Sequence, residues 1–502
     1  MEPLSRRHAL QLGGVGVASV LVGGAGLARE LTSAFDPLTG AGLAEPPVLA
    51  STGGLLQVRL EAAEGRHELA GRRATTLGYN GGLPGPTLRV RPGDRLRVRL
   101  VNRLDAPTNL HVHGLHVSPA GNGDNVFVTV EPGASFDYDY QLGEDHPPGL
   151  YWYHPHHHGM VADQVFGGLY GAIVVDEPAG DAGSEAAPVP VTRERVLVIS
   201  DISLDSSGRI QPVSAMAQVL GREGDVVLVN GQVRPRVAAR PDERERWRIV
   251  NACAARYLRL RLDGQQLQLL GMDSGRYAMP SSVDEIILTP GNRADVLVTT
   301  ADGTSELVAL PYDRGSMMMG MMGQDGGGGM SGMGSSTSEA NDDAEGKVLV
   351  TMTVSGDPVP PLPAVVRRPE ERDLRGADVT RSRELTFAMG MGGGGMRSTI
   401  DGRVFDPERI DQNVQVGSVE EWTLTNTSPM DHPVHLHVWP MQIVEQSGSP
   451  VPSTVWQDVV NVPAQGQVKV RVAFDNFPGR TVYHCHILDH EDSGMMGVVT
   501  AG

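Results

Sequence analysis

Residues 483–495 read Tyr483-His484-Cys485-His486-Ile487-Leu488-Asp489-His490-Glu491-Asp492-Ser493-Gly494-Met495 and hold the densest group of metal-binding side chains in the chain. We expect a strand that runs into a loop, and neighbouring side chains of a strand point to opposite faces. His484 and His486 therefore face away from Cys485. Cys485, His490 and Met495 are three of the four ligands of a blue-copper electron-transfer site, whose methionine bond is long and weak. The alternative is a surface loop around a buried cysteine that acts as a small core hydrophobe.

The histidine spacing of this stretch recurs upstream. The four His-x-His pairs are His111/His113, His154/His156, His435/His437 and His484/His486. A single pair is equally well a solvent-facing pair or half of a zinc site. Four pairs supply eight imidazoles, enough for three metal ions between two domains, and imidazole suits copper. His432 lies outside the pairs and can complete the site of Cys485.

A segment with a turn, a proline-bearing middle and a closing strand occurs three times. The copies begin at Asn80-Gly81, Asn230-Gly231 and Asp401-Gly402, and they end at Asn102, Asn251 and Asn426. Turn residues followed by alternating strands predict three similar β-sandwich domains. The composition agrees, because 63 Gly, 35 Pro and only 5% aromatic residues favour short strands joined by turns. We therefore expect an all-β protein of three domains.

Composition shifts predict the domain boundaries. We expect a linker over 29–50, domain 1 over 51–178, domain 2 over 190–355, a second linker over 356–384 and domain 3 over 385–502. No histidine occurs between His158 and His432, so domain 2 has no imidazole for a metal. Two Gly/Met tracts, 316–334 in domain 2 and 389–396 in domain 3, lack strand or helix periodicity and predict flexible loops.

The charge and the N-terminus constrain partners and location. The formal net charge of -18 over 502 residues argues against a nucleic-acid partner. Arg6-Arg7 precede a short apolar run that is too rich in glycine for a membrane span. Residues 1–28 resemble a twin-arginine export signal, although Ala9 stands where an aromatic residue is usual. We expect a periplasmic, cell-surface or secreted protein with no membrane span in the mature chain. The alternatives are an ordinary secretory signal or a weak membrane anchor.

The four histidine motifs, in this order, resemble those of the multicopper oxidases over about residues 60–502. The resemblance implies three cupredoxin-like, Greek-key β-sandwich domains and four copper ions per chain. It implies a type 1 copper held by His432, Cys485, His490 and Met495, and a type 2 copper held by His111 and His435. It implies a type 3 pair held by His113, His154, His156, His437, His484 and His486.

The family's chemistry couples one-electron oxidation of a substrate at type 1 copper to reduction of O2 to two waters at the three-copper cluster. The resemblance implies that electrons leave the type 1 site through Cys485, whose neighbours His484 and His486 belong to the cluster. It also implies acidic residues that supply protons. Glu491 matches one such position, and Asp124 matches the other more loosely. The alternative for either residue is a solvated loop carboxylate.

Members of the family differ in the reductant that they oxidise. Thioethers bind Cu(I) in preference to hard cations, so the Met-rich tracts favour a cuprous oxidase similar to the bacterial copper-efflux type. Met430, Asp431 and Met441 flank His432 and form a candidate Cu(I) docking point, the alternative being packing residues and a surface acid. A laccase-type oxidase of phenols and aromatic amines is the second candidate, and an exported copper-buffering protein is the third. We expect a monomer, because one chain supplies both halves of the cluster.

Overall fold

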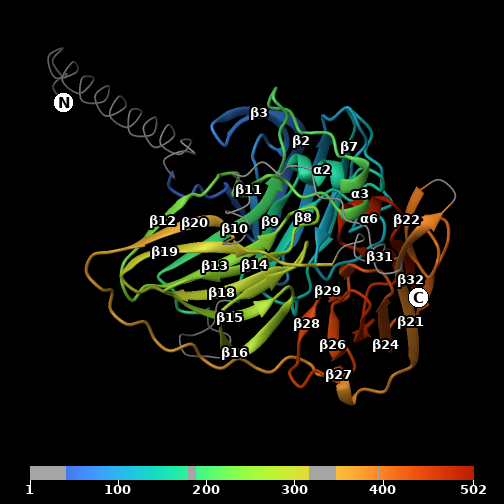
Figure 1. Ribbon diagram of the computed structural model, residues 1–502. Coiled ribbons are helices and arrows are strands. Elements are labelled where there is room, and N and C mark those ends of the chain that lie inside the picture. Colours follow the sequence, from blue (N-terminus) through green and yellow to red (C-terminus); the bar gives the residue numbers. More distant parts are fainter. Residues whose placement is uncertain (1–40, 179–187, 316–345, 393–394) are drawn as a thin grey trace, which may run out of the picture.

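Six β-sheets, paired into three sandwiches, make up the computed structural model, which describes residues 41–178, 188–315, 346–392 and 395–502 (Figure 1). The expected export signal and the Met-rich tract 316–334 lie outside the described residues. In each sandwich, apolar side chains of both sheets share one core. The all-β prediction with three cupredoxin-like domains is confirmed.

Domain 1 packs a five-stranded sheet on a four-stranded sheet, with one helix at its edge. The five strands, in sheet order, are β1 (Val48–Ala50), β4 (Thr87–Val90), β9 (Gly171–Val175), β8 (Gly149–His154) and β6 (His111–His113). The four strands are β3 (Arg72–Tyr79), β2 (Leu55–Leu69), β5 (Arg95–Asn102) and β7 (Ser135–Gln141). The helix is α2 (Val161–Gly167).

Domain 2 pairs a six-stranded sheet with a five-stranded sheet and carries the short helix α3 (Ala215–Leu220). The six strands are β11 (Val226–Val229), β10 (Arg193–Ile202), β13 (Arg244–Asn251), β18 (Arg293–Thr299), β15 (Gln266–Met272) and β16 (Gly275–Val283). The five strands are β12 (Arg236–Ala239), β20 (Lys347–Val354), β19 (Gly303–Leu310), β14 (Leu258–Leu262) and β17 (Ile286–Leu288).

Domain 3 pairs a seven-stranded sheet with a five-stranded sheet. The first holds β22 (Gly395–Ile400), β21 (Arg381–Gly392), β24 (Val419–Asn426), β30 (Gln467–Ala473), β26 (Met441–Gln446), β27 (Ser449–Pro450) and β28 (Trp456–Gln457). The second holds β23 (Gln412–Val414), β32 (Met496–Ala501), β31 (Gly479–Cys485), β25 (His432–Leu436) and β29 (Val459–Val462). The helical segments are η1 (Leu374–Gly376) and α6 (Leu488–Asp492).

The threefold repeat has a common geometry. Each domain pairs its first long strand in parallel with the strand that closes the repeat, as in β2 with β5, β10 with β13 and β21 with β24. The turn that begins each repeat has two successive residues with positive φ, for example Asn80 at 54° and Gly81 at 71°. Asn, Asp and Gly tolerate this conformation best, which explains their presence at all three turns.

The asparagine that ends each repeat anchors the following loop. Asn102 Nδ2 donates to Ala106 O and Val130 O, both at 2.8 Å. Asn251 and Asn426 make the matching bonds in their own domains. A buried side-chain amide with paired carbonyls is costly to remove, so the same residue closes each copy.

The strands differ from the expected pattern at three places. Strand β1 lies inside the expected linker 29–50, and β21 begins at Arg381, inside the expected linker 356–384. The Gly/Met tract 389–396 was expected to be a loop, but it forms the hairpin of β21 and β22, with Met391 opposite Met396. Backbone pairing that starts at Phe387 and Ile400 continues through the tract, because a ladder needs no particular side chain.

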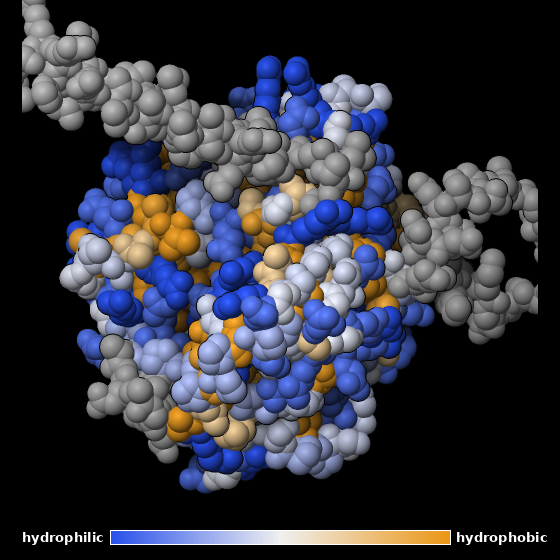
Figure 2. Space-filling model, turned by 90° about the vertical axis from the view of Figure 1, so that its left-hand side faces the viewer, coloured by the Kyte–Doolittle hydropathy of each residue, from blue (hydrophilic) through white to orange (hydrophobic). Residues whose placement is uncertain are grey.

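The visible surface is mostly hydrophilic. Figure 2 shows small apolar areas separated by hydrophilic side chains. Such a surface fits the formal net charge of -18. None of the helices in the described part of the chain is long and apolar enough to cross a membrane.

Candidate metal centres

The predicted type 1 ligands meet at one end of the domain 3 sandwich. Cys485 ends β31, and its Sγ lies 3.4 Å from His432 Nδ1 and 3.8 Å from His490 Nδ1. Met495 is fully buried in the same apolar cluster as Cys485, and its carbonyl accepts a 3.0 Å bond from Cys485 N. The structure therefore gathers three ligand atoms, with the Met495 side chain buried beside them.

The outer nitrogens of the two imidazoles are held by other groups. His490 Nε2 donates to Val219 O at 2.9 Å, and His432 Nε2 lies 2.7 Å from Ser428 Oγ. Such contacts fix the ring orientation, and the carbonyl also fixes the tautomer of His490, whose Nδ1 keeps its lone pair toward Cys485. Burial lowers the pKa of His490 to about 3 and that of His432 well below its usual value. Both rings are neutral, as metal binding requires.

The four His-x-His pairs meet between domains 1 and 3. Strand pairing sets His111 opposite His154 and His435 opposite His484. Across the domain interface, His113 stacks on His435 with ring centroids 3.8 Å apart, and His111 stacks on His437 at 3.9 Å. All eight imidazoles are buried. The spacing in the sequence thus becomes a closed histidine cluster built by two domains.

The chemistry of these nitrogens fits bound copper. His154 Nδ1 donates to Pro155 O and His435 Nδ1 donates to Asp458 O, which leaves the Nε2 atom of each ring as a free base. Other cluster nitrogens also lack a hydrogen-bond partner among the described residues; they are His111 Nε2, His113 Nδ1, His437 Nδ1 and both nitrogens of His486. Buried polar atoms are rarely left unpaired, so these nitrogens fit the role of metal ligands.

Electrostatics also favours neutral rings in the cluster. Burial lowers the pKa of His154 to about 3. Burial, followed by the neighbouring imidazoles, lowers the pKa of His111, His156 and His437 well below its usual value. Neutral imidazoles are the form that binds a metal.

The groups of neighbouring ligand atoms do not follow the type 2 and type 3 ligand sets that the family implies. Ligand atoms that lie within 4.8 Å of one another form the groups His111/His113/His154, His111/His435/His437, His156/His437/His484 and His113/His435/Asp458, besides the group of Cys485. The predicted ligand His486 belongs to none of these groups, although its ring centroid lies 4.9 Å from that of His113. His67, His116, His146, His157 and His158 also belong to none of them, and His8 lies outside the described residues. The geometry shows one shared cluster, and the division into type 2 and type 3 ligands stays a prediction.

Both predicted acids touch this cluster. The Asp124 carboxylate lies 2.9 Å from His111 Nδ1, and burial raises its pKa to about 8. Glu491 is fully buried, with Oε2 at 3.0 Å from His484 Nδ1 and Oε1 at 3.5 Å from His156 Nε2. Neither oxygen of Glu491 has a well-aligned hydrogen bond with a described residue. Neither acid is a solvated loop carboxylate.

The short helix α6 carries both His490 and Glu491, and the other two domains hold it. Arg222 of domain 2 forms a two-pronged ion pair with Asp489, with Nη2 at 2.7 Å and Nε at 3.0 Å from Oδ1. Asp492 accepts N–H bonds from Gly159 and Ala162 at the start of α2 in domain 1, at 2.7 and 2.8 Å. A helix this short gains little from its own hydrogen bonds, so these contacts fix its place.

The candidate Cu(I) docking residues are buried. Met430 and Met441 are each 1% exposed, and Met441 belongs to the core of domain 3. The Asp431 carboxylate accepts bonds from Tyr312 Oη, Asn461 Nδ2 and Ala464 N at 2.8–3.0 Å. These contacts match the packing alternative for the two methionines and give Asp431 a structural task beside His432.

Sequence reasoning missed two residues at the histidine cluster. Asp458 lies 3.0 Å from His113 Nε2, and Arg293 of domain 2 forms a bidentate ion pair with Asp458 at 2.5 and 2.6 Å. Neither residue belongs to a histidine motif, and 165 positions separate them. Only a pattern that linked charged residues of different domains would have identified them.

Known proteins with similar sequences and structures agree with this geometry. Family models described as multicopper oxidase match residues 61–180, 201–307 and 378–502. The cell division protein FtsP of Sodalis glossinidius is 30% identical over 514 residues, which cover 98% of each chain. The multicopper oxidase mco of Staphylococcus epidermidis is 27% identical over 455 residues, covering 88% of this chain and 87% of the relative. A Campylobacter jejuni multicopper oxidase, described as a metallo-oxidase, matches with a TM-score of 0.77 at 29% identity, covering 93% of this chain and 97% of that one.

Proposed function

The chain belongs to the multicopper oxidase family, and from this premise we propose that it is a cuprous oxidase, which oxidises Cu(I) and reduces O2 to water. Copper bound in its two histidine-rich centres supplies one-electron transfer from the reductant and the reduction of O2. An O2-reducing oxidase is not a copper buffer, so the choice that remains is between Cu(I) and phenolic reductants.

The proposal assigns the ligands as the family pattern implies. Type 1 copper is held by His432, Cys485, His490 and Met495; type 2 copper by His111 and His435; and the type 3 pair by His113, His154, His156, His437, His484 and His486. Cys485 ends β31, and one peptide bond joins it to each of its neighbours His484 and His486, so the covalent path between the two centres is short. Asp124 and Glu491 deliver protons at the His111 and His484 sides of the cluster.

The position of the Met-rich tract 316–334 carries the preference for Cu(I). Gly315, which precedes the tract directly, forms a β-bridge with Met430, and Arg314 O accepts a 2.7 Å bond from Asp431 N. The tract therefore begins beside the segment that leads into His432. Its seven thioethers are soft ligands suited to Cu(I). We propose that the tract, and not only Met430, Asp431 and Met441, delivers Cu(I) to this centre.

The cover over the type 1 centre gives further support. His432 and His490 are both 0% exposed. Helix α3 contacts α6, and Val219 O at its end occupies the outer nitrogen of His490. Because neither imidazole is exposed, a bulky phenol cannot contact them directly in this conformation, whereas a small ion needs only a path of thioether ligands. The Campylobacter relative's description as a metallo-oxidase points the same way.

Replacing all seven methionines of 316–334 by leucine is expected to slow Cu(I)-driven O2 uptake about 10-fold, the equivalent of ~1.4 kcal/mol in binding. Leucine keeps a similar apolar volume and removes the sulfur. The rate with a simple diphenol, measured on the same preparations, is the internal control and should not change. Faster turnover of the diphenol than of Cu(I) by the unaltered chain, with no effect of the leucines, would establish the laccase-type alternative.

We also propose that the chain is exported through the twin-arginine route and works as a monomer. Replacing Arg6 and Arg7 by lysine is expected to leave the protein inside the cell, which cell fractionation would detect. Undiminished export of the double-lysine variant would reject this route.

Light scattering should give the mass of one chain, and twice that mass would reject the monomer.

A further inference from the structure

A tight turn of domain 2 reaches the histidine cluster, although that domain supplies no metal ligand. The turn covers residues 289–292, between β17 and β18, and Arg293 begins β18. Asn292 fixes it, because its Nδ2 donates to Asp273 Oδ2 at 2.8 Å and to Val459 O of domain 3 at 3.0 Å. Gly291 N donates to Asn251 O at 3.0 Å. The turn is therefore bound to both its own domain and domain 3.

Gly291 brings its backbone against two imidazoles. Its φ of 88° is one that side chains rarely allow. A Cβ atom at this position would lie 2.9 Å from His486 Cδ2 and 3.1 Å from His113 Cε1. Contacts this short cannot persist without a shift of the rings. The glycine thus permits close approach beneath one histidine from each of two domains.

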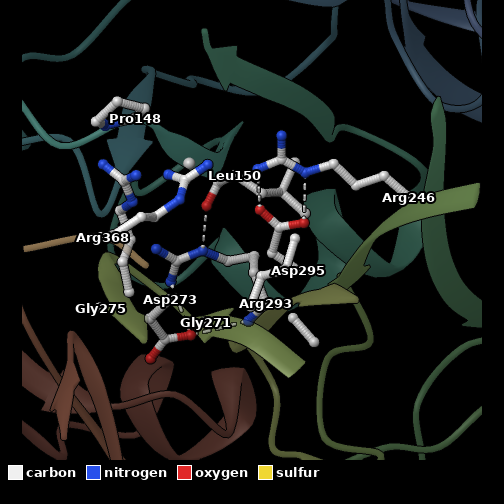
Figure 3. Close-up of a pocket in the computed structure, with 13 residues that line it drawn as sticks. Pro148, Leu150, Arg246, Gly271, Asp273, Gly275, Arg293, Asp295 and Arg368 are labelled. Carbon is white, nitrogen blue, oxygen red and sulfur yellow. Dashed lines mark hydrogen bonds and ion pairs between the residues drawn. The ribbon is translucent and has the colours of Figure 1, made fainter. Parts of the chain in front are cut away.

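Arg293 joins all three domains at one guanidinium. The side chain is fully buried. Its Nε donates to Leu150 O of β8 in domain 1 at 3.0 Å, and its Nη1 lies 3.2 Å from Asp273 Oδ1 of domain 2 (Figure 3). Its two terminal nitrogens hold Asp458 of domain 3 at 2.5 and 2.6 Å. This planar fork fixes the plane of the Asp458 carboxylate, which a lysine cannot do.

Asp458 transmits this orientation to the cluster. Its Oδ1 lies 3.0 Å from His113 Nε2, and its carbonyl accepts a 2.7 Å bond from His435 Nδ1. His113 and His435 come from different domains and stack with their centroids 3.8 Å apart. One residue therefore sets the orientation of an imidazole on each side of the interface. Contacts of this kind hold metal ligands in their binding geometry.

We propose that Arg293 and Gly291 are positioning residues for the three-copper cluster, acting through Asp458 on His113 and His435 and directly on His113 and His486. The proposal rests on the ligand assignment given under the proposed function. The proposal gives a function to domain 2, which has no histidine of its own. The domain sets the spacing of the two halves of the cluster.

The test compares two buried arginines of domain 2. Arg246 pairs with Asp295 (Figure 3) and with Glu177 at 2.5–2.8 Å and is nearly as buried as Arg293. None of its hydrogen bonds or ion pairs among the described residues involves a histidine. Arg293→Lys is expected to weaken copper binding in the cluster about 10–100-fold, as loss of an outer partner of a metal ligand does. After dialysis the variant should show fewer than four coppers per chain and an altered or lost type 2 EPR signal. Its blue type 1 absorption should persist.

The matched control and a second variant keep the proposal falsifiable. Arg246→Lys should keep four coppers and an unaltered type 2 signal. Gly291→Ala should reproduce the copper loss of Arg293→Lys without altering a charged side chain. Four coppers and an unchanged type 2 signal in both Arg293→Lys and Gly291→Ala would overturn the proposal, as would equal copper loss in Arg246→Lys. A native protein that binds only one copper would instead overturn the ligand assignment.

Discussion

A Cys485→Ser variant is expected to lose its blue colour. Its rate of O2 uptake with any reductant should fall by more than about 100-fold, which exceeds the fall that usually follows when the outer hydrogen-bond partner of a metal ligand is removed. Cys485 Sγ lies between the Nδ1 atoms of His432 and His490, and its backbone leads to His484 and His486. Burial raises the pKa of the thiol, so a bound metal is needed to hold the thiolate. A hydroxyl is a harder and poorer ligand for copper. Visible absorption and oxygen-electrode rates measure both effects.

The second cysteine provides the matched control. Cys253 is equally buried in domain 2, where its Sγ lies 3.9 Å from Ile199 O and it joins no ligand group. Cys253→Ser should therefore keep the blue colour and the rate. A blue Cys485→Ser protein would show that the type 1 assignment is wrong.

Glu491→Gln is expected to slow O2 reduction about 100-fold, at the low end of what loss of a positioned proton donor costs. The carboxyl group is fully buried, faces His484 and His156, and has no well-aligned hydrogen bond among the described residues. Glutamine keeps its shape but cannot release and regain a proton. The blue absorption should not change, because the type 1 ligands are untouched. Reoxidation of the fully reduced protein by O2, followed in a stopped-flow spectrometer, isolates this step.

A variant of the neighbouring acid, Asp492, distinguishes a loss of proton supply from a loss of packing. Asp492 follows Glu491 directly, but its carboxylate accepts backbone N–H bonds at α2 and does not face the imidazoles. An Asp492→Asn variant keeps one acceptor oxygen, which can serve two of the three bonds, and leaves the imidazoles untouched, so its rate should stay near that of the unaltered protein. An unchanged rate in Glu491→Gln, or an equal loss in Asp492→Asn, would remove Glu491 from the proton path.

Local patterns carried most of the fold and the ligand set. Alternation along β31 put His484 opposite Cys485, and the spacing of two residues put His111 and His113 on one face of β6. In the other three pairs the second histidine lies just past the end of its strand. The turn residues Asn80-Gly81 and their two later copies marked the repeat, because few other residues adopt positive φ. Each of these signals depends on neighbours in sequence, so it can be read before the chain is folded.

The Gly/Met tract 389–396 is a segment whose structure the local sequence pattern did not predict. Glycine and methionine there carry no alternation, so the sequence predicted a loop. The hairpin forms because β21 is already paired with β24 and extends past Phe387 into the tract. Pairing of backbone groups with an existing sheet outweighs the lack of a side-chain pattern.

The sequence by itself determined three β-sandwich domains, the histidines and the cysteine that form the two clusters, and the two acids beside them. Only the tertiary structure decided that Arg293 reaches the cluster through Asp458 and that Gly291 lies against two of its imidazoles, that α3 covers His490, and that Met441 is a core residue. The physical reason is the range of the interactions. Strand alternation and turn conformation are properties of adjacent residues, whereas an ion pair between residues 165 positions apart exists only when packing brings two domains together.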